Sequence, residues 1–184
     1  MRVIAGSLRG RRLAAPRGRG TRPTPDRVRE ALFSALGSVE GLAVLDLYAG
    51  SGALAIEALS RGAVRAVAVE RAAPALRALG QNLTDLELTD RCAVLALPVE
   101  RSVRALAERG PFGLVLADPP YADLGAGRAI ARVLGGAQVV APAARLVVEH
   151  AARSEPPEIA GAQWLRTRRY GDTALSQYDL DSTG

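Results

Sequence analysis

Short apolar runs alternate with amphipathic segments along most of the chain. Five runs rich in Val, Leu and Ala are predicted to be strands, at residues 43–47, 66–70, 93–95, 114–117 and 146–149. Between them, apolar residues recur at every third or fourth position, which is the spacing of one helix face. Strands that are apolar throughout and alternate with helices indicate a parallel sheet covered on both sides, in an α/β fold.

The two ends of the chain depart from this alternation. Near the start, Thr24, Pro25 and Asp26 predict the first turn of a helix, because Thr caps, Pro fits the first position and Asp favours the helix dipole. Near the end, residues 164–169 and 175–180 flank a Tyr-Gly-Asp turn and predict a hairpin. We therefore expect a doubly wound, mostly parallel seven-stranded sheet with a C-terminal antiparallel hairpin.

The composition is that of one globular domain. The chain has 184 residues, of which 48% are hydrophobic and 23% are charged, so a wholly disordered chain is excluded. The apolar runs are too short to cross a membrane and the first six residues lack a signal-peptide core, so we expect a cytoplasmic monomer without a membrane partner. One cysteine and one histidine leave too few soft ligands for zinc, and no metal is expected. We expect Phe33, Phe112 and Trp164 in the core.

The basic charge is concentrated at the start of the chain. All 24 basic residues are Arg; nine lie in residues 1–30 beside two acidic residues, which gives this segment a net charge of +7, against −2 for residues 31–184. A basic segment on a near-neutral domain predicts binding of nucleic acid, and a merely solubilising tail is the alternative. The expected organisation is a basic arm that binds nucleic acid at 1–30 and a folded domain at 31–184. The candidate nucleic-acid contacts are Arg2, Arg9, Arg11, Arg12, Arg22 and Arg27.

A glycine turn follows the first predicted strand. Gly50 and Gly52 would let a ligand approach the backbone, and their spacing fits the dinucleotide pattern G-x-G-x-x-A. Glu70 ends the second strand, where an acid can bind ribose hydroxyls. Asp46, four residues before the turn, would repel a pyrophosphate, whereas it suits the ammonium and sulfonium groups of S-adenosylmethionine. The pattern therefore favours S-adenosylmethionine over NAD.

An Asp-Pro-Pro-Tyr run follows the fourth predicted strand of the same sheet. Its two prolines, Pro119 and Pro120, remove two amide donors and stiffen the turn, so carbonyl oxygens stay available as acceptors. Asp118 can accept a hydrogen bond from an exocyclic amine, and Tyr121 can stack on a base. This combination predicts methylation of an amino group on a planar heterocycle; the alternative is a rigid surface loop.

Taken together, these segments resemble the RsmD family of 16S rRNA guanine-N2 methyltransferases, which have the Rossmann-like class I fold. The resemblance rests on residues 2–6, 9–11, 22–33, 46–53, 118–121 and 170–173. It implies S-adenosylmethionine as cofactor and, as substrate, the guanine at position 966 of 16S rRNA in the small ribosomal subunit or its assembly intermediate. The expected catalytic residues are Asp118, Pro119, Pro120 and Tyr121. The expected cofactor-binding residues are Asp46, Tyr48, Ala49, Gly50, Ser51, Gly52, Glu70, Arg71, Leu97, Thr24 and Arg29.

Other functions remain open at this point. A DNA adenine-N6 methyltransferase shares the Asp-Pro-Pro-Tyr run but normally adds a target-recognition domain, for which this chain has no room. A protein glutamine methyltransferase would have Asn in place of Asp118. A non-catalytic RNA-binding assembly factor would not need the acidic and glycine residues of both motifs. The loop at residues 96–100 departs from the family pattern because no acid follows the third strand directly, so the group that meets the cofactor's adenine is open.

Overall fold

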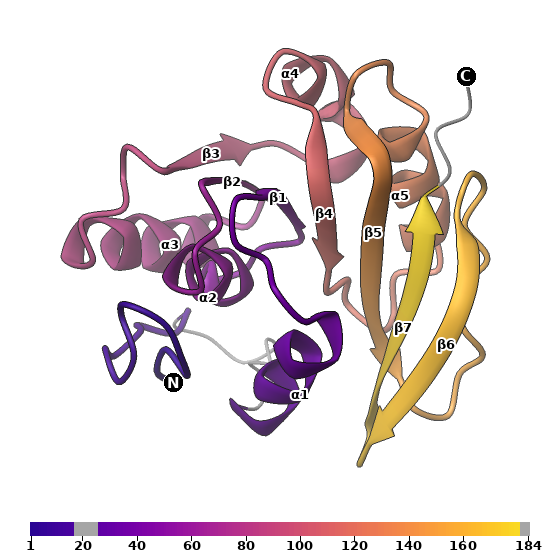
Figure 1. The fold of residues 1–184 in the computed structure, drawn as a ribbon. Coiled ribbons are helices and arrows are strands. Elements are labelled where there is room, and N and C mark those ends of the chain that lie inside the picture. Colours follow the sequence, from indigo (N-terminus) through magenta and orange to yellow (C-terminus); the bar gives the residue numbers. More distant parts are fainter. Residues whose placement is uncertain (17–25, 181–184) are drawn as a thin grey trace.

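The computed structural model describes residues 1–16 and 26–180 (Figure 1). The five α-helices and the 3-10 helix of this part are α1 (Asp26–Leu36), α2 (Ala53–Ser60), α3 (Ala73–Asp85), η1 (Val99–Arg101), α4 (Val103–Ala107) and α5 (Ala126–Leu134). The strands are β1 (Ala43–Leu47), β2 (Arg65–Glu70), β3 (Cys92–Ala96), β4 (Phe112–Ala117), β5 (Val140–Ala151), β6 (Gln163–Tyr170) and β7 (Thr173–Leu180). The helix cap expected at Thr24 and Pro25 lies outside the described residues.

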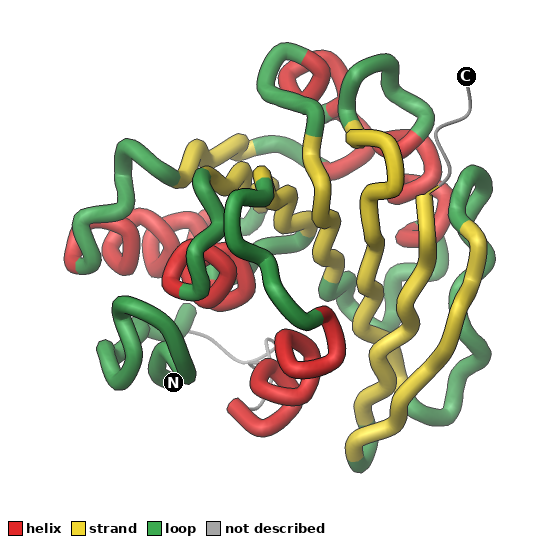
Figure 2. The backbone as a smooth tube through the Cα atoms, viewed as in Figure 1, coloured by secondary structure: helices red, strands yellow, loops and turns green. Residues whose placement is uncertain are grey.

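The strands form one seven-stranded sheet in the order β3-β2-β1-β4-β5-β7-β6. Strands β1 to β5 are parallel to one another, whereas β7 runs antiparallel to both β5 and β6. Figure 2 shows this sheet with helices on both of its sides. The expected fold is therefore confirmed, and the direction of winding reverses between β1 and β4. Crevices at such a switch point are where doubly wound sheets bind their ligands.

Two apolar layers cover the sheet. Helices α1, α2 and α3 pack on one face, and α4 and α5 pack on the other. Along β4 the side chains alternate between the layers, with Leu114 and Leu116 in the first and Val115 and Ala117 in the second. Because both faces are buried, most positions of the central strands are apolar, which is why these strands stand out in the sequence; Asp46 of β1 is a buried exception.

The basic N-terminal segment is partly built into the domain. Val3 and Leu13 are buried in the layer formed by α1 to α3. The backbone amides of Ile4 and Ala5 donate to the Glu57 carboxylate of α2, at 2.8 and 3.0 Å. The domain boundary expected at residue 30 falls inside α1. Residues 1–16 and α1 contribute to the same apolar layer as α2, the helix that follows Gly52.

A buried ion pair joins α1 to α2. Arg29 and Glu57 are both fully inaccessible, and Arg29 Nε lies 3.6 Å from Glu57 Oε2. Arg61 Nε lies 2.7 Å from the other oxygen of Glu57, and Arg29 also donates to Asp26 and to the carbonyl of Arg2. Removal of one partner from such a pair leaves an uncompensated buried charge, which typically costs about 3–5 kcal/mol. The pair therefore fixes α1 and the N-terminal segment against α2.

Two sequence expectations need correction. Strand β5 extends over Val140–Ala151 rather than 146–149; its first residues include Pro142, and a proline within a run argues against a strand in the sequence. Trp164, expected in the core, is 53% exposed because β6 is an edge strand. Phe33 and Phe112 are buried as expected. No helix within residues 1–16 and 26–180 is long and apolar enough to cross a membrane.

Candidate functional site

Three neighbouring strands end at the same level of the sheet. Leu47, the last residue of β1, pairs with Val69 of β2 and with Ala117 of β4. The segments that follow these strands therefore meet at one edge. The amide of Asp118 donates to the carbonyl of Leu47 at 3.3 Å, which joins the Asp-Pro-Pro-Tyr loop to the start of the glycine turn. The structure thus brings together the two motifs that the sequence analysis singled out.

The glycine turn has an unusual backbone. Tyr48, Gly50 and Gly52 all have positive φ, at 62°, 57° and 79°. For a tyrosine this conformation costs about 1–2 kcal/mol, so the surrounding contacts hold it in place. A Cβ on Gly52 would lie 2.3 Å from a methyl carbon of Leu79, whereas a Cβ on Gly50 would meet nothing nearer than 4.0 Å. Gly52 is thus favoured by its positive φ, and a side chain there would also displace the end of Leu79, whereas Gly50 leaves open space beside the turn.

Glu70 lies against this turn. Its Oε2 accepts a hydrogen bond from the amide of Gly50 at 2.8 Å. Its Oε1 accepts from the amides of Arg71 and Ala72, at 2.7 and 2.8 Å. The end of β2 is therefore tied to the turn after β1, and the carboxylate borders the open space at Gly50.

Asp46 is the buried carboxyl of the site. It is 1% exposed, and its Oδ2 accepts from the amide of Ala55 at 3.0 Å. Within the described part of the chain, its Oδ1 has no hydrogen-bond partner. Burial, with smaller contributions from the charges of Asp118 and Glu70, raises the pKa of Asp46 to about 8. Three carboxyl groups therefore share this edge, and a cation would stabilise their ionised forms.

The Asp-Pro-Pro-Tyr loop leads from β4 toward β5 and β7. Pro119 is buried and Pro120 is exposed, and the carbonyl of Pro120 accepts from the amide of Asp123 at 2.8 Å. Tyr121 is half exposed. Its hydroxyl lies 3.0 Å from Thr173 Oγ1 and donates to Glu149 Oε1 at 3.4 Å. Tyr121 is thus partly open to solvent while the hydroxyl at the end of its ring is held by the sheet.

Only some of the remaining cofactor candidates lie at the edge of the sheet that carries the glycine turn. Arg71 and Leu97 follow β2 and β3, so they lie at the same edge as the glycine turn. Ser51 is buried, and its carbonyl accepts from the side chain of Asn82 at 2.9 Å. Arg29 points instead into the buried pair with Glu57. Thr24 lies outside the described residues, and Ala49 packs in the core.

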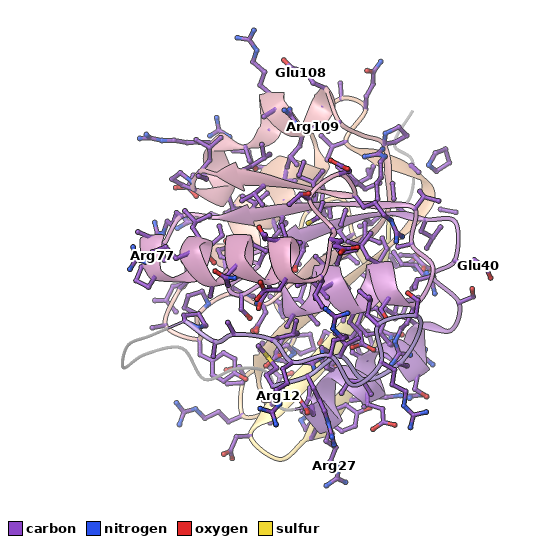
Figure 3. All side chains as sticks on the ribbon, turned by 90° about the vertical axis from the view of Figure 1, so that its left-hand side faces the viewer. Arg12, Arg27, Glu40, Arg77, Glu108 and Arg109 are labelled. Atoms are coloured by element: carbon purple, nitrogen blue, oxygen red, sulfur yellow. The ribbon has the colours of Figure 1, made fainter. Side chains whose placement is uncertain are left out.

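The candidate RNA contacts in the described segments are exposed. Figure 3 shows Arg12 and Arg27 in the lower part of the molecule, with Arg27 projecting from it, whereas Glu108 and Arg109 lie at the upper end. In Figure 1, β4 and β5 run toward the lower end. Arg2, Arg9 and Arg11 are also exposed, although Arg11 donates to the carbonyl of Asp85 at 2.8 Å. Arg22 lies outside the described residues.

Sequence reasoning missed three side chains at this edge. Thr173 and Glu149 contact Tyr121, and Asn82 joins the glycine turn to the backbone of Ala14. Thr173 belongs to a segment that carries the resemblance, at residues 170–173, but no role followed from the residue type alone. Asn82 could have been noted as an amide on the buried face of a helix.

The chain is similar to several proteins whose names describe methyltransferases. A family model described as "Conserved hypothetical protein 95" matches residues 1–179. The chain is 39% identical to "Putative rRNA methyltransferase YlbH" of Bacillus subtilis over 97% of this chain and 98% of that protein. It is 41% identical to "Ribosomal RNA small subunit methyltransferase D" of Escherichia coli K12, over 66% of this chain and 60% of that protein. The solved structure "Putative methyltransferase yhhF from Escherichia coli" is 32% identical with a TM-score of 0.83, and the match covers 100% of this chain and 99% of that one.

The raised pKa of Asp46 predicts a pH-dependent stability. The folded protein holds a proton on Asp46 that the unfolded chain releases near pH 4, so this group's contribution to the free energy of unfolding falls as pH rises from about 4 to about 8. The slope approaches 1.4 kcal/mol per pH unit within that window. Urea unfolding at several pH values should show this loss in the wild type and a flatter profile in Asp46→Asn. Parallel profiles would contradict the assignment.

Proposed function

Since the chain belongs to the family described as Conserved hypothetical protein 95, that of the RsmD-type rRNA methyltransferases, we propose that it methylates the exocyclic N2 of a guanine in 16S rRNA. The methyl donor is S-adenosylmethionine. One observation carries the proposal: the glycine turn and the Asp-Pro-Pro-Tyr loop meet where Asp118 N donates to Leu47 O. The residues proposed to bind the methyl donor and those proposed to bind the acceptor amine therefore lie next to each other.

The residues of the edge fit this cofactor. The space that a side chain on Gly50 would occupy is open, and the Glu70 carboxylate beside it suits ribose hydroxyls. The unpartnered Oδ1 of Asp46 and its raised pKa suit a ligand that carries positive charge. When bound, S-adenosylmethionine supplies a methyl group activated by its sulfonium. NAD would bring a pyrophosphate to an edge that already holds three carboxyl groups, so repulsion disfavours it.

The Asp118 loop supplies what the acceptor amine needs. Guanine N2 is a weak nucleophile because its lone pair is delocalised into the ring. Hydrogen bonds from the amine to the Asp118 carboxylate and to a carbonyl of the proline pair would localise that lone pair and aim it at the methyl group. The half-exposed ring of Tyr121 offers a stacking surface for a base that has left its helical stack. This account needs no strong general base.

The same acceptor chemistry would serve the N6 amine of adenine in DNA. RNA is favoured because the named relatives are ribosomal RNA methyltransferases. A non-catalytic assembly factor is disfavoured because Asp46, Glu70 and Asp118 lie together, at an electrostatic cost that RNA binding alone would not require.

The exposed arginines support an RNA surface at the same end of the molecule. Arg12 and Arg27 are exposed and lie in the lower part of the molecule, toward which β4 and β5 run (Figures 1 and 3). Phosphate contacts made there would orient the rRNA with the target base near Tyr121. We therefore assign residues 1–16 and the first turn of α1 to the rRNA backbone.

Mapping the modified nucleotide tests the proposal directly. Small subunits from a strain that lacks this enzyme would be incubated with the purified protein and radioactive S-adenosylmethionine, and the labelled nucleotide would be identified by nuclease digestion and mass spectrometry. We expect N2-methylguanosine at position 966 of 16S rRNA. Labelling of another base, or labelling of DNA but not rRNA, would contradict the proposal.

Asp118→Ala should separate methyl transfer from cofactor binding. Loss of a hydrogen bond formed in the transition state typically lowers the rate about 100-fold or more, and the variant should show at least that loss in single-turnover assays on small subunits. Its affinity for S-adenosylmethionine, measured by calorimetry, should change little, because Asp118 is assigned to the acceptor amine. Near-wild-type turnover would refute the assignment.

Replacement of Arg9, Arg11 and Arg12 by Ser should weaken RNA binding and reduce its salt dependence. Each lost phosphate contact should lower the slope of log affinity against log salt by about one unit, with cofactor affinity unchanged. Substrate affinity at several salt concentrations measures this. The matched control replaces the exposed arginines of η1, α4 and the turn after it, which are Arg101, Arg104 and Arg109. Equal effects of the two triple variants would mean that the N-terminal segment has no special role in binding.

A further inference from the structure

The aromatic side chain of the catalytic loop is anchored outside that loop. The hydroxyl of Tyr121 lies 3.0 Å from Thr173 Oγ1 at the start of β7, and 3.4 Å from Glu149 Oε1 near the end of β5. Building on the proposed function, we propose that Thr173 is a positioning residue for methyl transfer: it fixes the ring of Tyr121 as the surface against which the target base stacks, with Glu149 as the second hydrogen-bond partner.

Both partners belong to a rigid frame. Thr173 is opposite Ala151 in the β5–β7 ladder, and Glu149, two residues before Ala151, points to the same face of the sheet. Thr173 and Glu149 are 8% and 5% exposed. Their positions are therefore set by the ladder between β5 and β7 rather than by the loop that carries Tyr121.

The hydrogen-bonding capacities of the three groups agree with one arrangement. An ionised carboxylate can only accept, so the Tyr121 hydroxyl donates to Glu149 and accepts from the hydroxyl of Thr173. Burial, together with the negative charge of Glu149, raises the pKa of Tyr121, so the phenol keeps its proton. Both hydrogen bonds of the hydroxyl are therefore made to residues of the sheet, and in this proposal the substrate base contacts the ring of Tyr121.

An anchored ring reduces the ordering that substrate binding would otherwise require. A half-exposed tyrosine on a loop would sample several rotamers, and the target base would have to fix one of them in every encounter. Holding the hydroxyl from β7 selects one rotamer in advance. Misplacement of the base then affects its alignment with the methyl group, so the expected loss lies in the rate of transfer rather than in cofactor binding.

A double-mutant cycle tests this. Thr173→Val removes the hydroxyl but keeps the shape of the side chain, Tyr121→Phe removes the other partner, and Thr173→Ser restores a hydroxyl. In single-turnover assays on small subunits, we expect Thr173→Val and Tyr121→Phe each to lower the rate roughly tenfold, with affinity for S-adenosylmethionine unchanged. The double variant should be no slower than either single variant, and Thr173→Ser should recover most of the rate.

Thr167→Val provides the matched control. Thr167 is on the partner strand of the same hairpin, and its Oγ1 lies 2.7 Å from Ser176 Oγ, so its removal costs a similar hydroxyl contact without touching Tyr121. The control should transfer methyl groups at the wild-type rate. Thermal unfolding of all variants would show that they are compared as folded proteins.

The outcomes separate this inference from the proposed function. Additive effects of Thr173→Val and Tyr121→Phe, a wild-type rate for Thr173→Val, or failure of Thr173→Ser to recover the rate would each overturn the positioning role. If wild-type protein transfers no methyl group to small-subunit rRNA, the proposed function is overturned, and this inference with it.

Discussion

The pairing of β1 with β4 fixes the geometry on which the site depends. These two strands lie where the sheet's winding reverses, and their last residues, Leu47 and Ala117, are in register. The chain leaves both strands at one level, so the glycine turn and the Asp-Pro-Pro-Tyr loop emerge side by side and are joined through the amide of Asp118. A shift of one residue in this register would turn every side chain of β4 to the opposite layer, and the apolar packing on both faces prevents it.

This geometry carries an electrostatic cost. Asp46 is buried with one oxygen unpartnered, and Asp118 and Glu70 lie close enough to raise its pKa further. Stability alone would favour an apolar residue at such a position, because a buried polar atom without a partner is unfavourable. Binding of a cation would explain why a buried carboxyl is kept at this position, since the positive charge lowers the energy of all three carboxylates. Functional sites are where such conflicts between stability and chemistry are expected.

The sequence predicted features that depend on local pattern, and missed those that depend on distant partners. The central strands were predictable because burial on both faces makes most of their positions apolar. The glycine turn was predictable because backbone conformation and residue type are directly linked. Arg29 was assigned to the cofactor, yet it is buried against Glu57, 28 residues away. The contact between Tyr121 and Thr173 spans 52 residues and has no local signature. The exposure of Trp164 follows from the edge position of β6, which only the strand order reveals.

Calorimetric titration at pH 7 in buffers of different ionisation enthalpy tests the central claim most directly: that this edge binds a cationic cofactor, and that Asp46, which is protonated before the cofactor binds, then loses its proton. We expect S-adenosylmethionine to bind far more tightly than NAD. Wild-type protein should also release up to one proton more on binding than Asp46→Asn, because the bound cation lowers the Asp46 pKa from about 8. Tighter binding of NAD, or equal proton release by the two proteins, would contradict the account.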